Sequence, residues 1–245
     1  MPVLQKPNMD VNCTMTNVSI FDGVPLSRGC VETRLGELIE TLDEPFRNLC
    51  HASSEDAGFT SQPGAIKKHH VWIGGLIHHT LEVMQACHVI YLMGGKRLNW
   101  NVLGTAAVFH DVGKLWDTEM IYPYPTSSMT ADTDKWEDVP VIGTDSKYAY
   151  KTALHARRIY HVSRSYHEWL KASEPWVRTG GVFGAFTEGD ETQPKKMSPE
   201  DCEHIAHCIL AHHGRLEWNT VKEPQTPEAL ALHLADMISA KVWNA

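Results

Sequence analysis

The sequence lacks the marks of several protein classes. It contains six cysteines among 245 residues, but no two of them form a CxxC pair, which argues against a zinc ribbon or a redox dithiol. No apolar run is long enough to span a bilayer. The first residues, MPVLQKPNMDVNCT, have no apolar segment behind a basic start, as a secretory signal would. We therefore expect free thiols, a cytoplasmic location and no membrane association.

Basic side chains are also scarce. The chain has 22 lysines and arginines against 30 aspartates and glutamates, which gives a formal net charge of −8. Proteins that bind long nucleic acids usually carry a basic face, because neutralising phosphates drives that affinity. The charge therefore disfavours a broad polyanion-binding surface. The length and a hydrophobic share of 42% are ordinary for a globular protein with a proper core.

Alternating strand patterns, internal repeats and low-complexity tracts are missing, whereas apolar residues recur at helical spacing. The sequence predicts an all-α helical bundle with long loops, formed by residues 32–245 behind a short irregular N-terminal arm at 1–31. We expect helices over about 65–93, 101–112 and 147–172, and two more beginning after the N-caps Ser198 and Thr226. Residues 53–63, 116–146 and 173–197 are predicted loops, and loops as long as the last two are often functional.

Histidine is the abundant exception, with 15 residues. His79 shares an apolar stripe with Leu76 and Val83, and His161 lies seven residues after Leu154 on one predicted helix face. Asp236 lies on the apolar face of the last helix, where an unpaired carboxylate is costly and a cation is the simplest partner. Gly74 and Gly75 interrupt the first long helix, which indicates close approach of another backbone or a ligand.

His110 and Asp111 are adjacent at the end of an apolar helix, where both side chains can reach one ion and the carboxylate can bridge two. A second pair, His212 and His213, ends another helix just before Gly214. Imidazole and carboxylate ligands suit Mn, Fe, Ni, Co or Zn. The candidates are too many for one ion and favour two; they are His79, His110, Asp111, His161, His212, His213 and Asp236.

The order of these residues resembles the H…HD…H…H…D pattern of HD-domain metal-dependent phosphohydrolases. The segments KHHVWIGGLIHHTL (68–81), ILAHHGRLEW (209–218) and TPEA…LHLADMISAK (226–241) are similar to the corresponding segments in the HD domain of YhaM-type 3′–5′ exoribonucleases. Together they cover roughly residues 63–243. A segment like the first also occurs in one class of conjugative relaxases.

The resemblance implies one or two divalent ions, Mg included, and a phosphohydrolase or phosphodiesterase acting on a nucleotide or the 3′ end of a short single-stranded RNA or DNA. In our hypothesis two ions about 3.5–4 Å apart clamp an in-line displacement by an activated water. Asp111, His110 and Lys114 are the predicted catalytic residues. The predicted phosphate contacts are Lys114, His69, His70 and Arg215.

Three alternatives stay open at this point. Some HD-fold proteins use a similar ligand set to activate oxygen at two irons. The chain could instead be an HD-like relaxase component of DNA processing, or a catalytically silent binding module. A homo-oligomer is compatible with each of these hypotheses.

Overall fold

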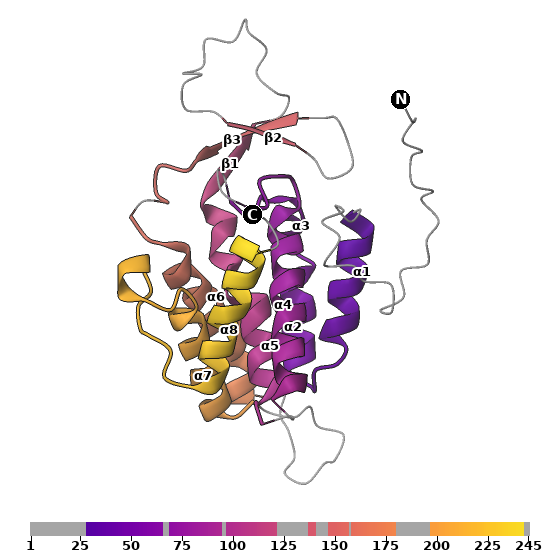
Figure 1. Ribbon diagram of the computed structural model, residues 1–245, viewed down its shortest axis with the longest axis vertical. Helices are drawn as coiled ribbons and strands as arrows, with labels where there is room; N and C mark the ends of the chain where they lie inside the picture. The colour runs from indigo at the N-terminus through magenta and orange to yellow at the C-terminus, as the bar shows by residue number, and fades with distance from the viewer. Residues whose placement is uncertain are drawn as a thin grey trace, which may run out of the picture.

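The computed structural model describes residues 28–65, 69–94, 97–121, 137–140, 147–156, 158–179 and 197–242. These residues form a mainly helical bundle with a small sheet at one end (Figure 1). The predicted all-α fold class is confirmed. Residues 1–27 of the predicted N-terminal arm, and residues 122–136, 141–146 and 180–196 of the two long predicted loops, lie outside the described residues. No helix in the described part of the chain is long and apolar enough to cross a membrane.

In the part of the chain that the structure describes, eight α-helices make up the bundle, together with three short helices of other types. The α-helices are α1 (Arg28–Ile39), α2 (Phe46–Ser54), α3 (Ala57–Ser61), α4 (Gly75–Met93), α5 (Trp100–Phe109), α6 (His161–Thr179), α7 (Pro199–Ala211) and α8 (Pro227–Met237). Two 3-10 helices, η2 (Val112–Trp116) and η4 (Leu216–Trp218), follow α5 and α7. The π-helix η5 (Ile238–Val242) continues α8.

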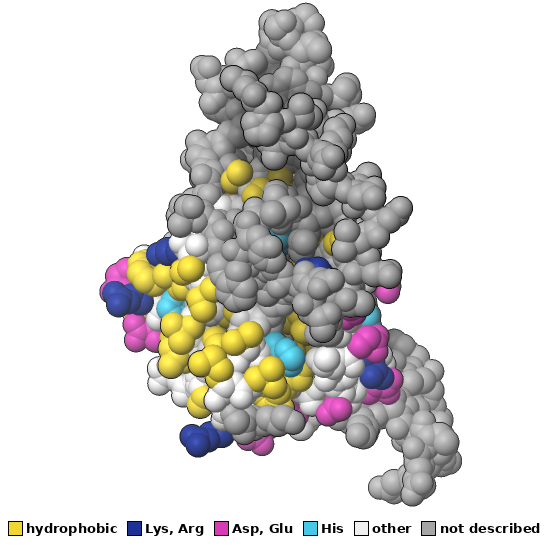
Figure 2. Space-filling view, turned by 45° about the vertical axis from the view of Figure 1, so that its right-hand side comes forward, with side chains coloured by type: hydrophobic (Ala, Val, Ile, Leu, Met, Phe, Trp, Pro, Cys, Tyr) yellow, Lys and Arg dark blue, Asp and Glu magenta, His cyan; other side chains and the backbone are white. Residues whose placement is uncertain are grey.

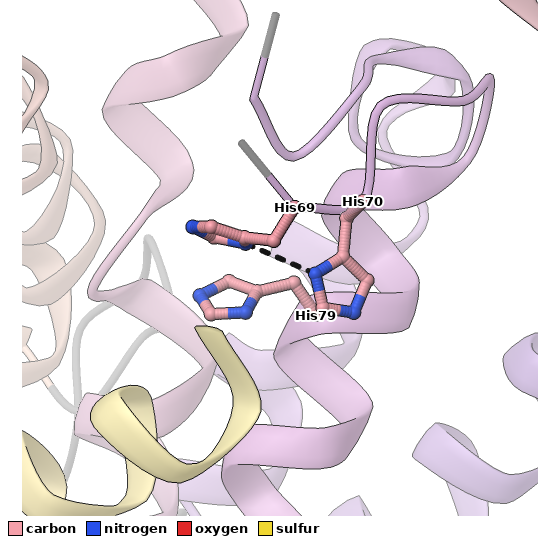
Figure 3. A group of neighbouring side chains, drawn as sticks. All are labelled: His69, His70 and His79. Atoms are coloured by element: carbon pink, nitrogen blue, oxygen red, sulfur yellow. Dashed lines mark hydrogen bonds between the residues drawn. The ribbon is translucent and has the colours of Figure 1, made fainter. Parts of the chain in front are cut away.

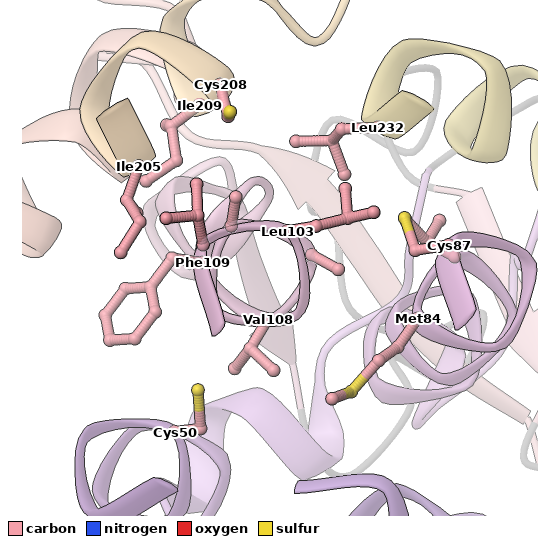
Figure 4. Close-up of a cluster of buried hydrophobic side chains, with 14 of the residues drawn as sticks. Cys50, Met84, Cys87, Leu103, Val108, Phe109, Ile205, Cys208, Ile209 and Leu232 are labelled. Carbon is pink, nitrogen blue, oxygen red and sulfur yellow. The ribbon is translucent and has the colours of Figure 1, made fainter. Parts of the chain in front are cut away.

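Helix α5 is the centre of the bundle and packs against α2, α4, α7 and α8. All its residues except Asn101 are buried, as expected for a helix surrounded by others. Figure 4 shows Leu103, Val108 and Phe109 pointing outward from α5 to side chains of the neighbouring helices. Asn99 caps the helix by accepting a hydrogen bond from the backbone N–H of Val102. Because α5 is held on all sides, its C-terminal end is a rigid platform for the residues that follow.

The predicted N-caps of the last two long helices are confirmed. The Ser198 hydroxyl accepts from the backbone N–H of Asp201, and the Thr226 hydroxyl accepts from that of Ala229. Each cap is followed by a proline at the first helical position. Each hydroxyl satisfies a backbone donor that has no partner inside the helix, and each proline removes another such donor because it has no N–H. Both features fix where α7 and α8 begin.

The predicted helix at 147–172 is wrong in its first half. Residues Lys147–Thr152 form strand β3, which pairs antiparallel with β1 (Thr118–Ile121) and β2 (Glu137–Pro140) in the order β1-β3-β2. The sequence KYAYKT has tyrosines two residues apart, at 148 and 150, and ends in a β-branched threonine, both of which favour a strand. Helix α6 begins only at His161, and Leu154, predicted to share its apolar face, is 91% exposed.

The N-terminal half also differs from the prediction. Helix α1 begins at Arg28, before the expected start, and α2 and α3 cover much of the predicted loop at 53–63. Helix α4 begins at Gly75 rather than near residue 65, after Gly74 with a φ of 80°. A Cβ on Gly75 would lie 1.9 Å from the carbonyl oxygen of His70. The predicted close backbone approach at this glycine pair is therefore confirmed.

Candidate metal centre

Asp111 is the hub of a cluster of histidines and carboxylates. It follows α5 directly and is only 2% exposed. Its Oδ2 lies 3.3 Å from Nε2 of His79 and 3.3 Å from Nε2 of His110. The same Nε2 of His79 lies 3.2 Å from Oδ1 of Asp236. Helices α4, α5 and α8 thus bring four predicted ligands together.

The other carboxylate oxygen of Asp111 faces a second group of imidazoles. Its Oδ1 lies 3.3 Å from Nε2 of His161 and 3.8 Å from Nε2 of His212. His161 and His213 approach each other with 3.2 Å between their Nε2 atoms. These rings come from the start of α6 and the end of α7. All seven predicted metal ligands therefore converge, with Asp111 between two groups.

The spacing and chemistry of these atoms fit divalent ions. Two ligand atoms that each lie about 2.1 Å from one ion are about 3.0–3.4 Å apart at octahedral or tetrahedral angles. The Nε2 atoms of His79 and His110 are 3.2 Å apart, within that range. Among the described residues, the buried Oδ1 of Asp111 receives no hydrogen bond. A shared cation would complete the coordination of an oxygen that is otherwise costly to bury.

Three rings have their second nitrogen bonded to the backbone. Nδ1 of His110 lies 2.8 Å from the carbonyl oxygen of Ala107, and Nδ1 of His212 lies 2.7 Å from that of Ile209. Nδ1 of His213 lies 2.6 Å from the carbonyl oxygen of Trp218. A carbonyl only accepts, so each Nδ1 carries a hydrogen, and Nε2 is the nitrogen that each ring turns to the cluster. Metal-binding histidines are held in this way.

Helix geometry favours positive charge at the same place. His110 and His212 are the C-caps of α5 and α7, and Asp236 lies at the C-terminal end of α8. The C-terminal end of a helix carries partial negative charge. Three such ends meet at the cluster, so the backbone adds to the attraction that the two carboxylates exert on a cation.

Both carboxylates are ionised. Burial raises the pKa of Asp111, but Lys114 and His110 outweigh that effect and hold it well below its usual range. Burial also raises the pKa of Asp236, and His79 more than offsets this, so the pKa is again lowered. Each group therefore offers a negatively charged oxygen over the whole neutral range of pH.

The pKa values of the imidazoles shift in two directions. Burial lowers the pKa of His79, yet hydrogen bonds to Asp111 and Asp236 outweigh burial and raise it. Burial and the neighbouring His213 hold the pKa of His212 well below its usual value. His212 is thus neutral and ready to ligate, whereas a cation at His79 would have to displace a proton.

The predicted phosphate contacts lie at different distances from the metal centre. Nζ of Lys114 lies 2.5 Å from Oδ2 of Asp111, so this lysine reaches the centre. Arg215 is exposed and stacks on Trp218, with 5.1 Å from its guanidinium carbon to the ring centroid. Lys241 approaches the same ring at 5.1 Å. Since the Trp218 carbonyl holds His213, this basic aromatic group borders the centre.

His69 and His70 lie beside His79 and form with it a further group able to hold a cation (Figure 3). His70 is 1% exposed, and its Nε2 lies 3.0 Å from Oε2 of Glu82. The ring of His70 is therefore enclosed by protein atoms. Burial lowers the pKa of His69 to about 3 and that of His70 to about 4. Both rings are therefore neutral near pH 7.

Several residues that support the ligands were not singled out from the sequence. Ser239 lies 2.8 Å from Nδ1 of His79 and donates to Glu82. Asp117 pairs with Arg164 and lies 3.7 Å from Nδ1 of His161. One available signal is spacing, because Glu82 follows His79 by three residues and therefore lies on the same side of its helix.

Comparison with known proteins confirms the resemblance that the motifs predicted. The chain is similar to the 3′-5′ exoribonuclease YhaM of Bacillus subtilis, with 26% identity over 187 residues, which is 76% of this chain and 45% of that protein. The YhaM proteins of a Geobacillus species and of Bacillus velezensis are 24% and 26% identical over 184 and 186 residues, or 75% and 76% of the chain. The chain spans less than half the length of these relatives, 43% and 45% for the last two.

No protein-family model matches the chain. The search of solved structures also returned no significant match.

Proposed function

We propose that the chain is a divalent-metal-dependent phosphohydrolase or phosphodiesterase that acts on a nucleotide or on the 3′ end of a short single-stranded nucleic acid. The observation that carries the proposal is the pair of ligand groups on either side of the buried Asp111 carboxylate. His79, His110 and Asp236 would hold one ion with Asp111. The second group would hold another through the same carboxylate; it consists of His161, His212 and His213.

Divalent ions at such a site supply Lewis-acid polarisation of a phosphoryl oxygen and a water acidified to a pKa of about 7. The chain's own residues orient the metal ligands and exclude bulk water from one side of the centre. Asp111 and the α5 C-terminus fix the positions of the ligands, and burial of His79 and His110, both 0% exposed, keeps bulk water from that side. Lys114 brings a positive charge to the Asp111 carboxylate, where it can stabilise negative charge that develops on a phosphate oxygen.

Two observations support a small or short substrate. The first is the formal net charge of −8. The second is that, on the face of the molecule drawn in Figure 2, the described lysines and arginines are scattered among acidic and hydrophobic side chains. The exposed Arg215 and Lys241, stacked on Trp218, are candidate contacts for one phosphate or base next to the reacting one. Because the relatives are named 3′-5′ exoribonucleases, the 3′ end of RNA is the first substrate to test.

A cytoplasmic location is part of the proposal. Its support is that the five described cysteines are free thiols, as is usual in a reducing compartment.

The test is a hydrolysis panel with the intact chain. Nucleoside triphosphates, cyclic nucleotides, and RNA and DNA oligomers labelled at either end are incubated with Mn, Mg, Ni, Co or Fe. We expect metal-dependent release of phosphate or of nucleotides, and no release by Asp111→Asn. Oxygen uptake with iron and no hydrolysis would point to an oxygenase. Strand-specific nicking would point to a relaxase, and metal binding without any turnover would end the enzymatic proposal.

A further inference from the structure

Glu82 is a buried carboxylate on α4, three residues after the predicted ligand His79, and it joins two hydrogen-bond chains. Its Oε2 accepts from the hydroxyl of Ser239 at 2.7 Å and lies 3.0 Å from Nε2 of His70. Its Oε1 lies 3.5 Å from Nε2 of His78. Burial raises the pKa of Glu82, but its hydrogen bonds to His70 and Ser239 outweigh burial and lower it. Glu82 is therefore an ionised group that can only accept.

The first chain leads to His79. A serine hydroxyl has one hydrogen, and Ser239 uses it on Glu82. Nδ1 of His79, 2.8 Å from the same hydroxyl oxygen, must therefore donate. With a hydrogen held on Nδ1, the ring turns its Nε2 toward Asp111 and Asp236, and from this position Nε2 can bind a metal ion once its own proton is displaced.

The second chain leads to His69. Glu82 accepts from Nε2 of His70, and a neutral imidazole carries one hydrogen, so Nδ1 of His70 is bare. Nδ1 of His69 lies 3.1 Å from that nitrogen and must be the donor. The remaining nitrogen of His69, its Nε2, is then bare as well. Figure 3 shows the rings of His69 and His79 one above the other, with their outer nitrogens on the same side, away from His70.

The backbone around His70 is shaped to hold this arrangement. His70 has a φ of 52°, a left-handed conformation that costs a non-glycine residue free energy and is found where surrounding structure enforces it. Its carbonyl accepts from the backbone N–H of Gly64 at 2.9 Å. A Cβ on Gly75 would lie 1.9 Å from that carbonyl oxygen, so only glycine fits there.

We propose that Glu82 is a positioning residue that fixes a hydrogen on Nδ1 of two imidazoles at once, so that His79 and His69 both turn their Nε2 toward the metal centre. His69 thereby becomes an additional ligand, or an acceptor for a hydrogen bond from whatever occupies the centre. The proposal rests on the proposed function only for the identity of that occupant. The hydrogen positions follow from the network in the metal-free protein.

The experiment begins with long-range 1H–15N correlation spectra of the histidines in the metal-free protein. We expect wild-type His69 to carry its hydrogen on Nδ1. Ser239→Ala should change the hydrogen bonding of His79 alone, and His70→Phe should change that of His69 alone. Glu82→Ala should change both. A wild-type His69 with its hydrogen on Nε2 would overturn the proposal, whether or not the protein hydrolyses anything.

Zinc binding, measured by titration calorimetry, is the second readout. We expect Glu82→Ala to weaken it by about 10–100-fold, the usual effect of removing the partner of a ligating histidine. Glu82→Gln keeps an accepting oxygen and should retain most of the affinity. Glu228→Ala is the matched control, because Glu228 is also buried but accepts from the backbone N–H of Asn99, at the opposite end of α8 from Asp236.

The outcomes separate the possibilities. A loss of zinc affinity in Glu82→Ala, with the affinity retained in Glu82→Gln, supports the proposal. An equal loss in Glu228→Ala would show a general effect on folding and would overturn it, as would unchanged affinity in Glu82→Ala. If Glu82→Ala does not fold, the single-chain variants Ser239→Ala and His70→Phe decide the matter through their separate spectral changes. A wild-type protein that shows the expected hydrogens but binds no zinc would contradict the proposed function alone.

Discussion

Replacing Asp111 by asparagine should abolish the stabilisation that a divalent metal gives to this protein. The substitution keeps the shape of the side chain but removes the charge that lies between the two ligand groups. An ion that binds only the folded state stabilises it by about 2.7 kcal/mol when its concentration is 100 times the dissociation constant. We therefore expect wild-type protein to respond to metal and Asp111→Asn to respond little.

The size of the response follows from the length of the chain. For a protein of about 150–250 residues, 1 kcal/mol shifts the melting temperature by roughly 2–4 °C. Metal at 100 times its dissociation constant should therefore raise the wild-type Tm by about 5–11 °C. Because Asp111 also pairs with the half-buried Lys114, the variant should melt below the wild type even without metal. The informative quantity is the difference between metal-loaded and metal-free protein for each variant.

Differential scanning calorimetry with Mn, Co, Ni or Zn, each compared with a chelator, measures this difference. Asp43→Asn is a suitable control, because Asp43 bonds Asn101 at the opposite end of α5, and Asn101 is about 15 Å from Asp111 by helix rise. It should keep the full shift. The reasoning is refuted if Asp111→Asn retains the shift, or if wild-type protein shows none with any of the four metals.

The remaining predictions concern pH and two supporting side chains. Burial lowers the pKa of His69 to about 3 and that of His70 to about 4, so below pH 6.5 the unfolded chain binds more protons than the folded protein. The metal-free protein should therefore lose stability between pH 7 and 5. Urea unfolding at each pH measures this loss, and a gain in stability on acidification would contradict the prediction. Lys114→Ala should keep the metal-induced Tm shift but lower kcat by about 10²-fold, measured on the best substrate of the panel; unchanged kcat would make Lys114 a solvated helix-end charge. Asp117→Asn removes a partner of His161 and should weaken metal binding by about tenfold or more, whereas calorimetry showing wild-type affinity would exclude a supporting role.

Most of the ligand residues carry a local signal in the sequence; His161 is an exception, because Leu154, with which it was predicted to share a helix face, lies outside α6 and is 91% exposed. His79 was expected to face inward from its spacing alone, and α4 is indeed buried along that stripe. Asp236 is a predicted ligand because an ionised group on an apolar helix face needs a partner, and its partner in the structure is His79. Such positions follow from helical periodicity, which a single sequence contains.

The small sheet and the supporting network were not predictable in the same way. Strand β3 has an alternating pattern of only six residues, and its partners are short strands that form from separate parts of the chain. Likewise, Ser239 and Glu82 are 157 residues apart in sequence and meet only because α8 and η5 pack against α4. Hydrogen bonds between distant segments depend on tertiary packing, which local propensity does not encode.

The charge at the centre explains why a protein with this composition could still bind a phosphate ester. Two carboxylates and the ammonium of Lys114 together carry one net negative charge, and three helix C-termini add to it. A phosphate group would be repelled from such a site. Two divalent cations would reverse the sign and leave a strongly positive, partly buried centre, at which a phosphate is attracted without any broad basic surface. Under the proposed function, the cations therefore reconcile the acidic composition with a phosphate substrate, and the metal ligands would contribute to substrate binding as much as any lysine or arginine.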